Sequence, residues 1–253
     1  MGSVLEERRV SSPGTSVRPL RIGFLYGQFG EPEEWQPLID RLPAERFDPQ
    51  IIDYSRWPEW NRESLSFANW QAVAVTKLKS QDWDILVGYS LGGRLLLHLL
   101  EVAPTLAKQY VFLSTHPGLS SEDEKSARLK SDAKWADTFS NEDWSRAYAL
   151  WCAQPPFGPV EKSQVASPPA DLDFWIRALE NFSLARQKNF ETLIRENSSR
   201  VHWIVGELDR KFFEIATNLK AKNADLSVGS IEKVWHRVHR QAPGEVAQKL
   251  AGL

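Results

Sequence analysis

Short apolar runs alternate with longer amphipathic stretches along most of the chain. The apolar runs predict buried strands at residues 21–26, 48–54, 84–87, 109–114, 201–206 and 225–231. Between and after them, the spacing of apolar positions predicts helices at residues 33–42, 64–79, 91–103 and 244–250. Strands that alternate with helices are typical of an α/β fold built on a mostly parallel sheet flanked by helices.

One long block departs from this alternation. Residues 121–196 hold helix-like stretches, many charges and two proline pairs, with no clear strand. We therefore expect a helical lid over residues 119–198, inserted into a core formed by residues 20–118 and 199–253. Residues 1–19 mix charge, serine, glycine and proline without periodicity, which predicts a flexible tail.

The most informative motif is a serine between two glycines, residues 88–92 (GYSLG), placed between a predicted strand and a predicted helix. Gly-x-Ser-x-Gly in this context is the nucleophile elbow of α/β hydrolases, a turn so tight that small residues must flank it. The turn lifts the Ser90 hydroxyl above the sheet and points the amino end of the helix at the reacting atoms. Ser90 is therefore our candidate catalytic residue, and the alternative is a glycine-rich turn with a solvated serine.

A catalytic serine needs a base, and the base needs an acid to orient it. Reactive groups in parallel sheets gather beyond the carboxyl ends of the strands, where Asp209 and His236 follow the last two predicted strands. The chain order serine, aspartate, histidine is that of α/β hydrolases. Asp209 has an alternative role as the cap of a following helix, and Glu207 is its nearest rival, expected to face solvent. His239 stands close behind His236 as a second candidate base.

The same reasoning predicts an oxyanion hole and an anion-binding arginine. The main-chain N–H of Leu91, directly after the serine, and that of Gln28, in the turn after the first strand, are the expected oxyanion donors. Arg94 lies four residues after Ser90, one helical turn along, where a guanidinium can bind a carboxylate with two hydrogen bonds. The alternative for Arg94 is an ordinary surface arginine.

Composition narrows the classes of function. The 253 residues suffice for one α/β domain, and the net charge of −2 gives no general attraction to nucleic acid or anionic membranes. No apolar stretch is long enough to span a bilayer, and the N-terminus lacks the apolar core of a secretory signal. Five histidines without metal-ligand spacing argue against a metal site. One cysteine, Cys152, fits a reducing, cytoplasmic compartment, while the oligomeric state stays open.

Further segments carry a resemblance to a known family. They are residues 88–94 (GYSLGGR), 116–119 (HPGL), 124–128 (EKSAR), 131–132 (SD) with Trp135, Trp151 ahead of 154–155 (QP), 206–212 (GELDRKF) and 236–240 (HRVHR). Together they make the chain similar to the SHCHC synthases, the 2-succinyl-6-hydroxy-2,4-cyclohexadiene-1-carboxylate synthases of menaquinone and phylloquinone biosynthesis. The likeness runs from about residue 21 to the end of the chain.

The resemblance implies a carbon–oxygen lyase that uses hydrolase machinery. In such enzymes the Asp–His pair makes the serine a base that removes a ring proton. Pyruvate is then eliminated, without an acyl-enzyme and without a cofactor. On the matching positions of this chain, Ser90 is the base, His236 is its activator and Asp209 is the orienting acid.

The resemblance also implies a set of substrate-binding residues. Arg94 and Arg128 would hold substrate carboxylates, while Tyr89 and Trp151 would line the pocket. The expected partner is therefore a small anionic molecule with several carboxylates, which suits arginines inside a slightly acidic protein. The alternatives are a solvated helix arginine for Arg128 and plain packing for Trp151.

Four positions depart from the family pattern. Tyr26 replaces the usual histidine of the oxyanion turn, and Cys152 replaces the tyrosine that follows the tryptophan of the lid. Trp235 stands where a small residue is expected before the catalytic histidine. A further lid arginine has no clear counterpart, and Lys162 or Arg177 are its possible substitutes.

Two other functions therefore stay open. An ordinary serine esterase or thioesterase would use Ser90 as a nucleophile and form an acyl-enzyme. The other alternative is a non-catalytic binding protein with the same fold, for which Ser90→Ala would change no measurable activity.

Overall fold

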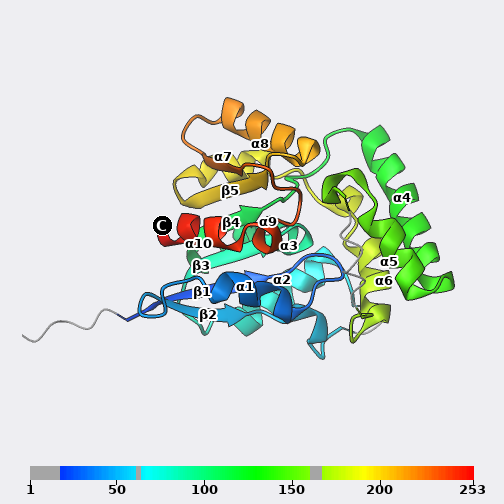
Figure 1. The fold of residues 1–253 in the computed structure, drawn as a ribbon, viewed down its shortest axis with the longest axis horizontal. Coiled ribbons are helices and arrows are strands. Elements are labelled where there is room, and N and C mark those ends of the chain that lie inside the picture. Colours follow the sequence, from blue (N-terminus) through cyan, green and yellow to red (C-terminus); the bar gives the residue numbers. More distant parts are fainter. Residues whose placement is uncertain (1–17, 61–63, 160–166) are drawn as a thin grey trace, which may run out of the picture.

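A wholly parallel sheet forms the centre of the computed structural model, which describes residues 18–60, 64–159 and 167–253 (Figure 1). Within these residues the sheet has six strands, in the spatial order β2-β1-β3-β4-β5-β6. The strands are β1 (Leu20–Leu25), β2 (Phe47–Ile51), β3 (Trp83–Tyr89), β4 (Ala107–Leu113), β5 (Val201–Gly206) and β6 (Ser227–Ile231). The predicted fold class is confirmed, and every predicted strand is present with ends shifted by no more than a few residues.

Helices flank the sheet, as the sequence predicts. They are α1 (Gln36–Ile39), α2 (Phe67–Leu78), α3 (Leu91–Val102), α8 (Arg210–Lys222), α9 (Val238–Gln241) and α10 (Pro243–Ala251). The prediction of one continuous helix at residues 33–42 is wrong, because a 3₁₀ turn, η1 (Pro32–Trp35), precedes the single turn of α1. Each piece carries a proline in its first turn, and a proline without an N–H suits a helix start rather than its interior.

In the described residues between β4 and β5 lie four more α-helices, and we call this segment, residues 119–198, the helical insertion. They are α4 (Glu122–Asn141), α5 (Trp144–Cys152), α6 (Leu172–Asn181) and α7 (Glu191–Glu196). Figure 1 shows α4, α5 and α6 beside one another along one end of the sheet. A capping box starts α4, because Ser121 Oγ accepts from the N–H of Glu124 while the Glu124 carboxylate accepts from the N–H of Ser121.

The strand order places a crevice at the carboxyl ends of β1 and β3. The chain leaves β1 for its neighbour β2 on one side and returns to β3 on the other, and ligands of open α/β sheets bind outside such a switch point. Gln28 follows β1 and Ser90 follows β3, so both lie at this crevice. Asp209 follows β5 and His236 follows β6, at the same edge of the sheet.

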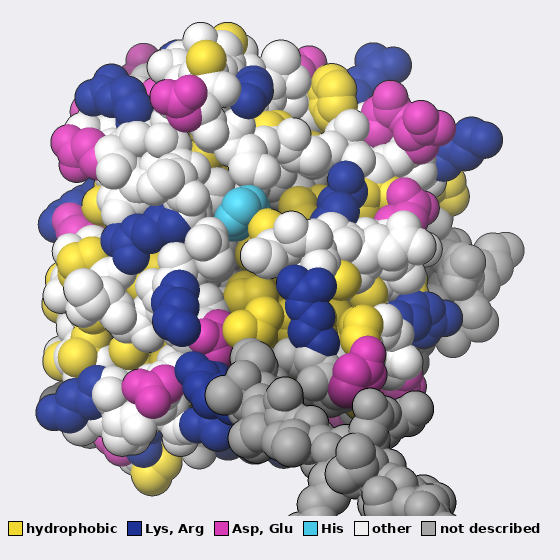
Figure 2. All heavy atoms as spheres, turned by 90° about the vertical axis from the view of Figure 1, so that its left-hand side faces the viewer, with side chains coloured by type: hydrophobic (Ala, Val, Ile, Leu, Met, Phe, Trp, Pro, Cys, Tyr) yellow, Lys and Arg dark blue, Asp and Glu magenta, His cyan; other side chains and the backbone are white. Residues whose placement is uncertain are grey.

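The opposite end of the molecule carries no concentration of one charge. Figure 2 shows that face with Lys and Arg side chains interspersed among Asp and Glu, in keeping with the net charge of −2. Arg18, the first described residue, donates to Asp84 Oδ2 at 2.7 Å. The remainder of the predicted tail, residues 1–17, lies outside the described residues, as does the part of the predicted lid at 160–166.

Candidate active site

Ser90 occupies the turn between β3 and α3 with a left-handed backbone, at φ 50° and ψ −108°. Glycines let the two elements approach closely around it. A Cβ on Gly92 would lie 2.3 Å from Leu25 O, and a Cβ on Gly93 would lie 1.9 Å from Thr115 Oγ1. Neither position accepts a side chain without a shift of its surroundings, which is the packing that a nucleophile elbow requires.

A chain of hydrogen bonds runs from Ser90 through His236 to Asp209. Nε2 of His236 lies 3.1 Å from Ser90 Oγ, and Nδ1 of His236 lies 2.6 Å from Asp209 Oδ2. His236 is 4% exposed and Asp209 is 1% exposed, so water is largely excluded from the pair. Glu207, the rival acid, is exposed on the surface. The arrangement can draw a proton from the serine hydroxyl.

Asp209 also starts helix α8. Its Oδ1 accepts a hydrogen bond from the main-chain N–H of Phe212 at 3.4 Å, while its Oδ2 binds His236. The capping role and the place in the hydrogen-bond chain, which the sequence analysis treats as alternatives, coexist on one carboxylate.

His239 occupies a different environment from His236. Its ring is fully buried, 4.3 Å from the ring of Tyr89 between centroids, and its Nε2 lies 3.6 Å from Glu34 Oε2. Burial lowers the pKa of His239, which favours a neutral ring. The fold therefore brings His236, rather than His239, to the Ser90 hydroxyl.

The two residues expected to supply the oxyanion donors, Gln28 and Leu91, line one cavity together with Ser90. The Gln28 side chain is engaged elsewhere, because its Nε2 donates to the main-chain carbonyl of Trp175 in α6 at 2.7 Å. The donor expected from Gln28 is accordingly its main-chain N–H and not this side chain.

Ser90 opens into this cavity, which has an empty volume of ≈ 530 Å³ and lies between the sheet and the helical insertion. Three cationic side chains line it: Arg94 from α3, Arg128 from α4 and Lys211 from α8. Trp151 from α5 forms another part of the wall. Two of these residues come from the insertion, so the cavity depends on that segment.

The three cations differ in how their charge is compensated. Arg128 Nε donates to both carboxylate oxygens of the buried Asp132, at 2.8 Å each. Arg94 donates to the carbonyl of Phe182 at 2.7 Å and forms no ion pair within the described residues, nor does Lys211. Burial, and after it the positive charge of Arg128, lowers the pKa of both Arg94 and Lys211. An anion in the cavity would offset the cost of burying these two charges.

Sequence reasoning missed Lys211 and His116 as cavity residues. Lys211 lies two residues after Asp209 in the first turn of α8, and this closeness to the predicted acid is the sequence feature that indicates a place near the site. His116 Nδ1 accepts from the N–H of Gly118 at 3.1 Å, so its proton resides on Nε2. Burial lowers the pKa of His116 to about 3, and its ring is therefore a neutral hydrogen-bond donor at physiological pH.

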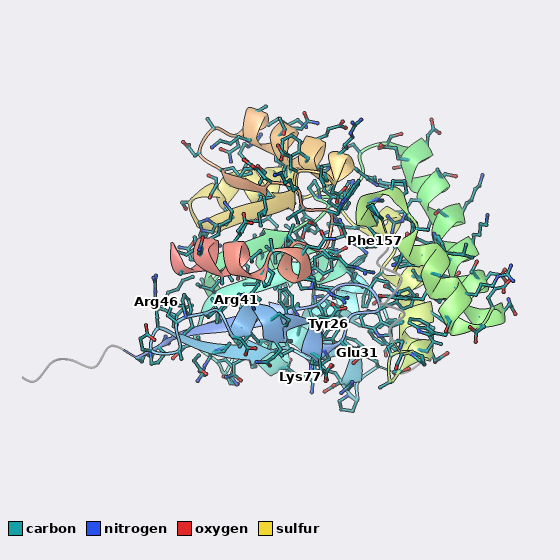
Figure 3. The ribbon with its side chains drawn as sticks, viewed as in Figure 1. Tyr26, Glu31, Arg41, Arg46, Lys77 and Phe157 are labelled. Carbon is teal, nitrogen blue, oxygen red and sulfur yellow. The ribbon has the colours of Figure 1, made fainter. Side chains whose placement is uncertain are left out.

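A second, smaller cavity adjoins the first, with an empty volume of ≈ 350 Å³. It shares Gln28, Ser90 and Trp151 with the first cavity, and Tyr89 and Phe157 help to line it. Figure 3 shows Phe157 where the helical insertion meets the rest of the molecule. Among the predicted site residues, Gln28, Tyr89, Ser90, Leu91, Arg94, Arg128 and Trp151 line one or both cavities, and His236 and Asp209 continue the hydrogen-bond chain from Ser90.

Two departures from the family pattern have a structural outcome. The indole of Trp235 packs against Gly158, and a Cβ on Gly158 would lie 2.4 Å from the nearest indole atom. The neighbouring His236 still forms its hydrogen bond to Asp209. Arg177, one proposed substitute for a lid arginine, binds Asp173 at 3.0 Å and does not line either cavity. Lys162, the other proposed substitute, lies outside the described residues.

Other site classes find no support in the described part of the chain. Residues 18–60, 64–159 and 167–253 contain no group of three or more His, Cys, Asp or Glu side chains arranged to hold a metal. None of the helices in these ranges combines the length and apolar character that crossing a bilayer demands.

The chain is similar to several known proteins. Residues 29–209 match the family described as the alpha/beta hydrolase fold. The chain is 31% identical over 241 residues to the 2-succinyl-6-hydroxy-2,4-cyclohexadiene-1-carboxylate synthase of Enterobacter sp. (strain 638), covering 91% of this chain and 90% of that protein. It is 32% identical over 245 residues to the protein of the same name from Escherichia coli O1:K1 / APEC, covering 91% and 92% of the two chains.

Solved structures share the fold. MenH from S. aureus superposes with a TM-score of 0.78 at 20% identity, covering 92% of each chain. A carboxylesterase of the thaumarchaeon Nitrososphaera gargenis superposes with a TM-score of 0.69 at 14% identity, covering 93% of this chain and 89% of that one.

Proposed function

This chain belongs to the α/β hydrolases and, within them, to the SHCHC synthase family, and from that premise we propose that it catalyses pyruvate elimination to form 2-succinyl-6-hydroxy-2,4-cyclohexadiene-1-carboxylate. One observation carries the proposal: hydrogen bonds connect Ser90 to His236 and His236 to Asp209, and Ser90 lines a cavity that three cationic side chains also line. The reaction belongs to menaquinone or phylloquinone biosynthesis.

In the proposed mechanism Ser90 acts as a base. His236 takes the hydroxyl proton, held in the correct tautomer by Asp209, and the serine oxygen removes a proton from the substrate ring. The electron pair of that C–H bond forms the new ring double bond, and the C–O bond to the enolpyruvyl group breaks. The leaving enolpyruvate takes up the proton that His236 holds and becomes pyruvate, which returns His236 to its neutral form and leaves Ser90 with the ring proton. No bond forms between Ser90 and the substrate.

Negative charge develops on the substrate carbonyl next to the ring when the proton leaves. In this proposal the charge is stabilised by the main-chain N–H groups of Gln28 and Leu91, two residues that line the cavity of Ser90. The loss of one such donor costs on the order of 3 kcal/mol of transition-state stabilisation in other enzymes. This role needs no metal or organic cofactor.

The substrate in this proposal is a small anionic molecule. In the first cavity Arg94 and Lys211 bind carboxylates of the substrate. Arg128, whose Nε is paired with Asp132, donates to them from its remaining N–H groups, and Trp151 forms an apolar wall. The helical insertion then acts as the lid that separates these groups from bulk water. We also propose a cytoplasmic location, supported by a composition with a single cysteine.

The test is a pyruvate-release assay with the family's precursor. Wild-type protein should release pyruvate, whereas Ser90→Ala and His236→Ala should each lose turnover by several orders of magnitude while the proteins stay folded. Turnover retained in Ser90→Ala would overturn the role of the serine as base.

The hydrogen-bond chain at Ser90 also suits a serine esterase or thioesterase, which is the second candidate. An activated ester distinguishes the two reactions. A burst of product and a trappable acyl group on Ser90 would support the hydrolase, and their absence together with pyruvate release would exclude it. If neither reaction occurs and Ser90→Ala changes nothing measurable, the chain is a binding protein.

A further inference from the structure

The second cavity contains a cation that the proposed mechanism does not use. Arg237 follows His236 directly and lines this cavity together with Ser90, Tyr89 and Trp151. Because the main-chain N–H of the neighbouring histidine binds Pro156 O at 3.0 Å, the backbone at this position is fixed against the insertion.

The contacts of Arg237 leave its charge uncompensated. Its Nη2 donates to Tyr148 OH at 3.2 Å and to Cys152 Sγ at 3.1 Å, and its guanidinium lies 4.8 Å from the centroid of the Phe157 ring. Within the described residues it forms no ion pair with a carboxylate. A guanidinium has five N–H donors, and a phenol, a thiol and an aromatic face are weak partners for them.

The one carboxylate that lines the same cavity is already paired. Glu34 Oε1 accepts from Arg240 Nη1 at 3.3 Å, and its Oε2 lies 3.6 Å from His239 Nε2. The repulsion that Glu34 would exert on an incoming anion is therefore reduced. Burial acts to lower the pKa of Arg237, yet the pKa stays above its ordinary value, so the guanidinium remains charged.

A count of charges connects this arginine with the reaction. The product of the family carries two carboxylates and pyruvate carries one, so the precursor carries three. Arg128 is neutralised by Asp132, which leaves three cations around Ser90 without a carboxylate partner in the described residues: Arg94 and Lys211 in the first cavity and Arg237 in the second.

Resting on the proposed function, we infer that Arg237 binds one of the three carboxylates of the precursor in the second cavity. The substrate then spans both cavities, with its reacting ring at Ser90, which both share. Arg237 is in this way a specificity residue that favours a tricarboxylate over smaller anions.

The experiment compares steady-state constants for the precursor. Arg237→Ala should raise KM roughly ten- to hundredfold, the loss expected for a hydrogen bond to a charged group, and change kcat less than about threefold. Arg237→Lys, which keeps the charge, should recover part of the loss. The matched control is Arg146→Ala, which removes an exposed arginine from α5, and its KM should equal that of wild type.

Cys152→Ala separates binding from support of α5. It removes a partner of Arg237, keeps the charge of Arg237 and lies outside the lining of the second cavity, so the inference predicts a KM near the wild-type value. An unchanged KM in Arg237→Ala, or an equal rise in Cys152→Ala, overturns the inference. Wild-type protein that releases no pyruvate would instead overturn the proposed function.

Discussion

The phenol of Tyr26 donates a hydrogen bond of 2.5 Å to Asp53 Oδ1, and its oxygen lies 2.9 Å from Ser55 Oγ. Burial is the main cause that raises the pKa of Tyr26, so the group donates as a neutral phenol. The hydroxyl of Tyr54 in turn donates to Tyr26 O at 3.1 Å. The turn that leads to Gln28 is therefore anchored by residues 53–55, at a position where the family pattern has histidine.

Removal of the Tyr26 hydroxyl should weaken this anchor. Tyr26→Phe leaves the buried Ser55 without its partner, and we expect a loss of about 1–2 kcal/mol in the free energy of unfolding. Urea denaturation of the two proteins measures it. An unchanged midpoint would show that Asp53 and Ser55 find other partners.

Loss of the hydrogen bond between Asp209 and His236 should lower kcat far more than loss of the charge of the neighbouring Glu207. Asp209→Asn keeps the size of the side chain but presents the imidazole with the wrong partner, and kcat should fall roughly 10⁴-fold, as in a serine-protease triad. Glu207→Gln is the control and should keep wild-type activity, because Glu207 is exposed. The reverse pattern would identify Glu207 as the orienting acid.

Lys211 should contribute to substrate binding. Lys211→Met preserves most of the side-chain volume and removes the charge, so KM for the precursor should rise about tenfold or more with a smaller change in kcat. Arg210→Ala, one position earlier and exposed, should leave KM unchanged. Equal KM values for the Lys211 variant and wild type would remove Lys211 from the binding set.

Gly93→Ala should be strongly destabilising. Its Cβ would lie 1.9 Å from Thr115 Oγ1 and 2.9 Å from Gly88 O, and we expect a loss of about 3 kcal/mol or more in the free energy of unfolding. Thr115→Ala in the same chain should recover part of it, because it removes the nearest atom. Gly244→Ala is the control, since its Cβ would meet only the Arg41 side chain at 3.7 Å, and it should cost nothing.

Buried His98 should make stability depend on pH. Its ring stacks on Phe67 at 4.0 Å, and burial lowers its pKa from 6.5 to about 3. Because the unfolded chain binds the proton first, stability falls as pH decreases from 6.5 toward 3, by up to about 1.4 kcal/mol per pH unit. Denaturation of wild type and His98→Leu across this range measures the difference in slope. Parallel pH profiles would contradict the assignment.

The fold and the hydrogen-bond chain could be predicted because their signals are local or topological. The elbow is a strand, a tight turn and a helix within one short segment, so residues 83–102 specify it almost alone. Asp209 and His236 lie far apart in the sequence, yet a parallel sheet places the ends of β5 and β6 at one edge. Their convergence on Ser90 follows from strand order.

Lys211 and Arg237 could not be assigned in the same way. Arg237 meets Cys152 across 85 positions of sequence, through the packing of the insertion on the loop after β6. The side-chain direction of Lys211 depends on how α8 packs on the rest of the fold, which apolar spacing in the sequence does not specify. The prediction for residues 33–42 failed for a simpler reason, because apolar spacing carries no information on where prolines interrupt a helix.

Two hydrogen bonds described above join the core to α6 and the residue that follows it, from Gln28 Nε2 to Trp175 O and from Arg94 Nη1 to Phe182 O, each at 2.7 Å. Both acceptors are peptide carbonyls, which every residue type supplies. Side chains of the helical insertion can thus change during evolution, and with them the substrate, while the hydrogen bonds that attach the insertion to Gln28 and Arg94 persist.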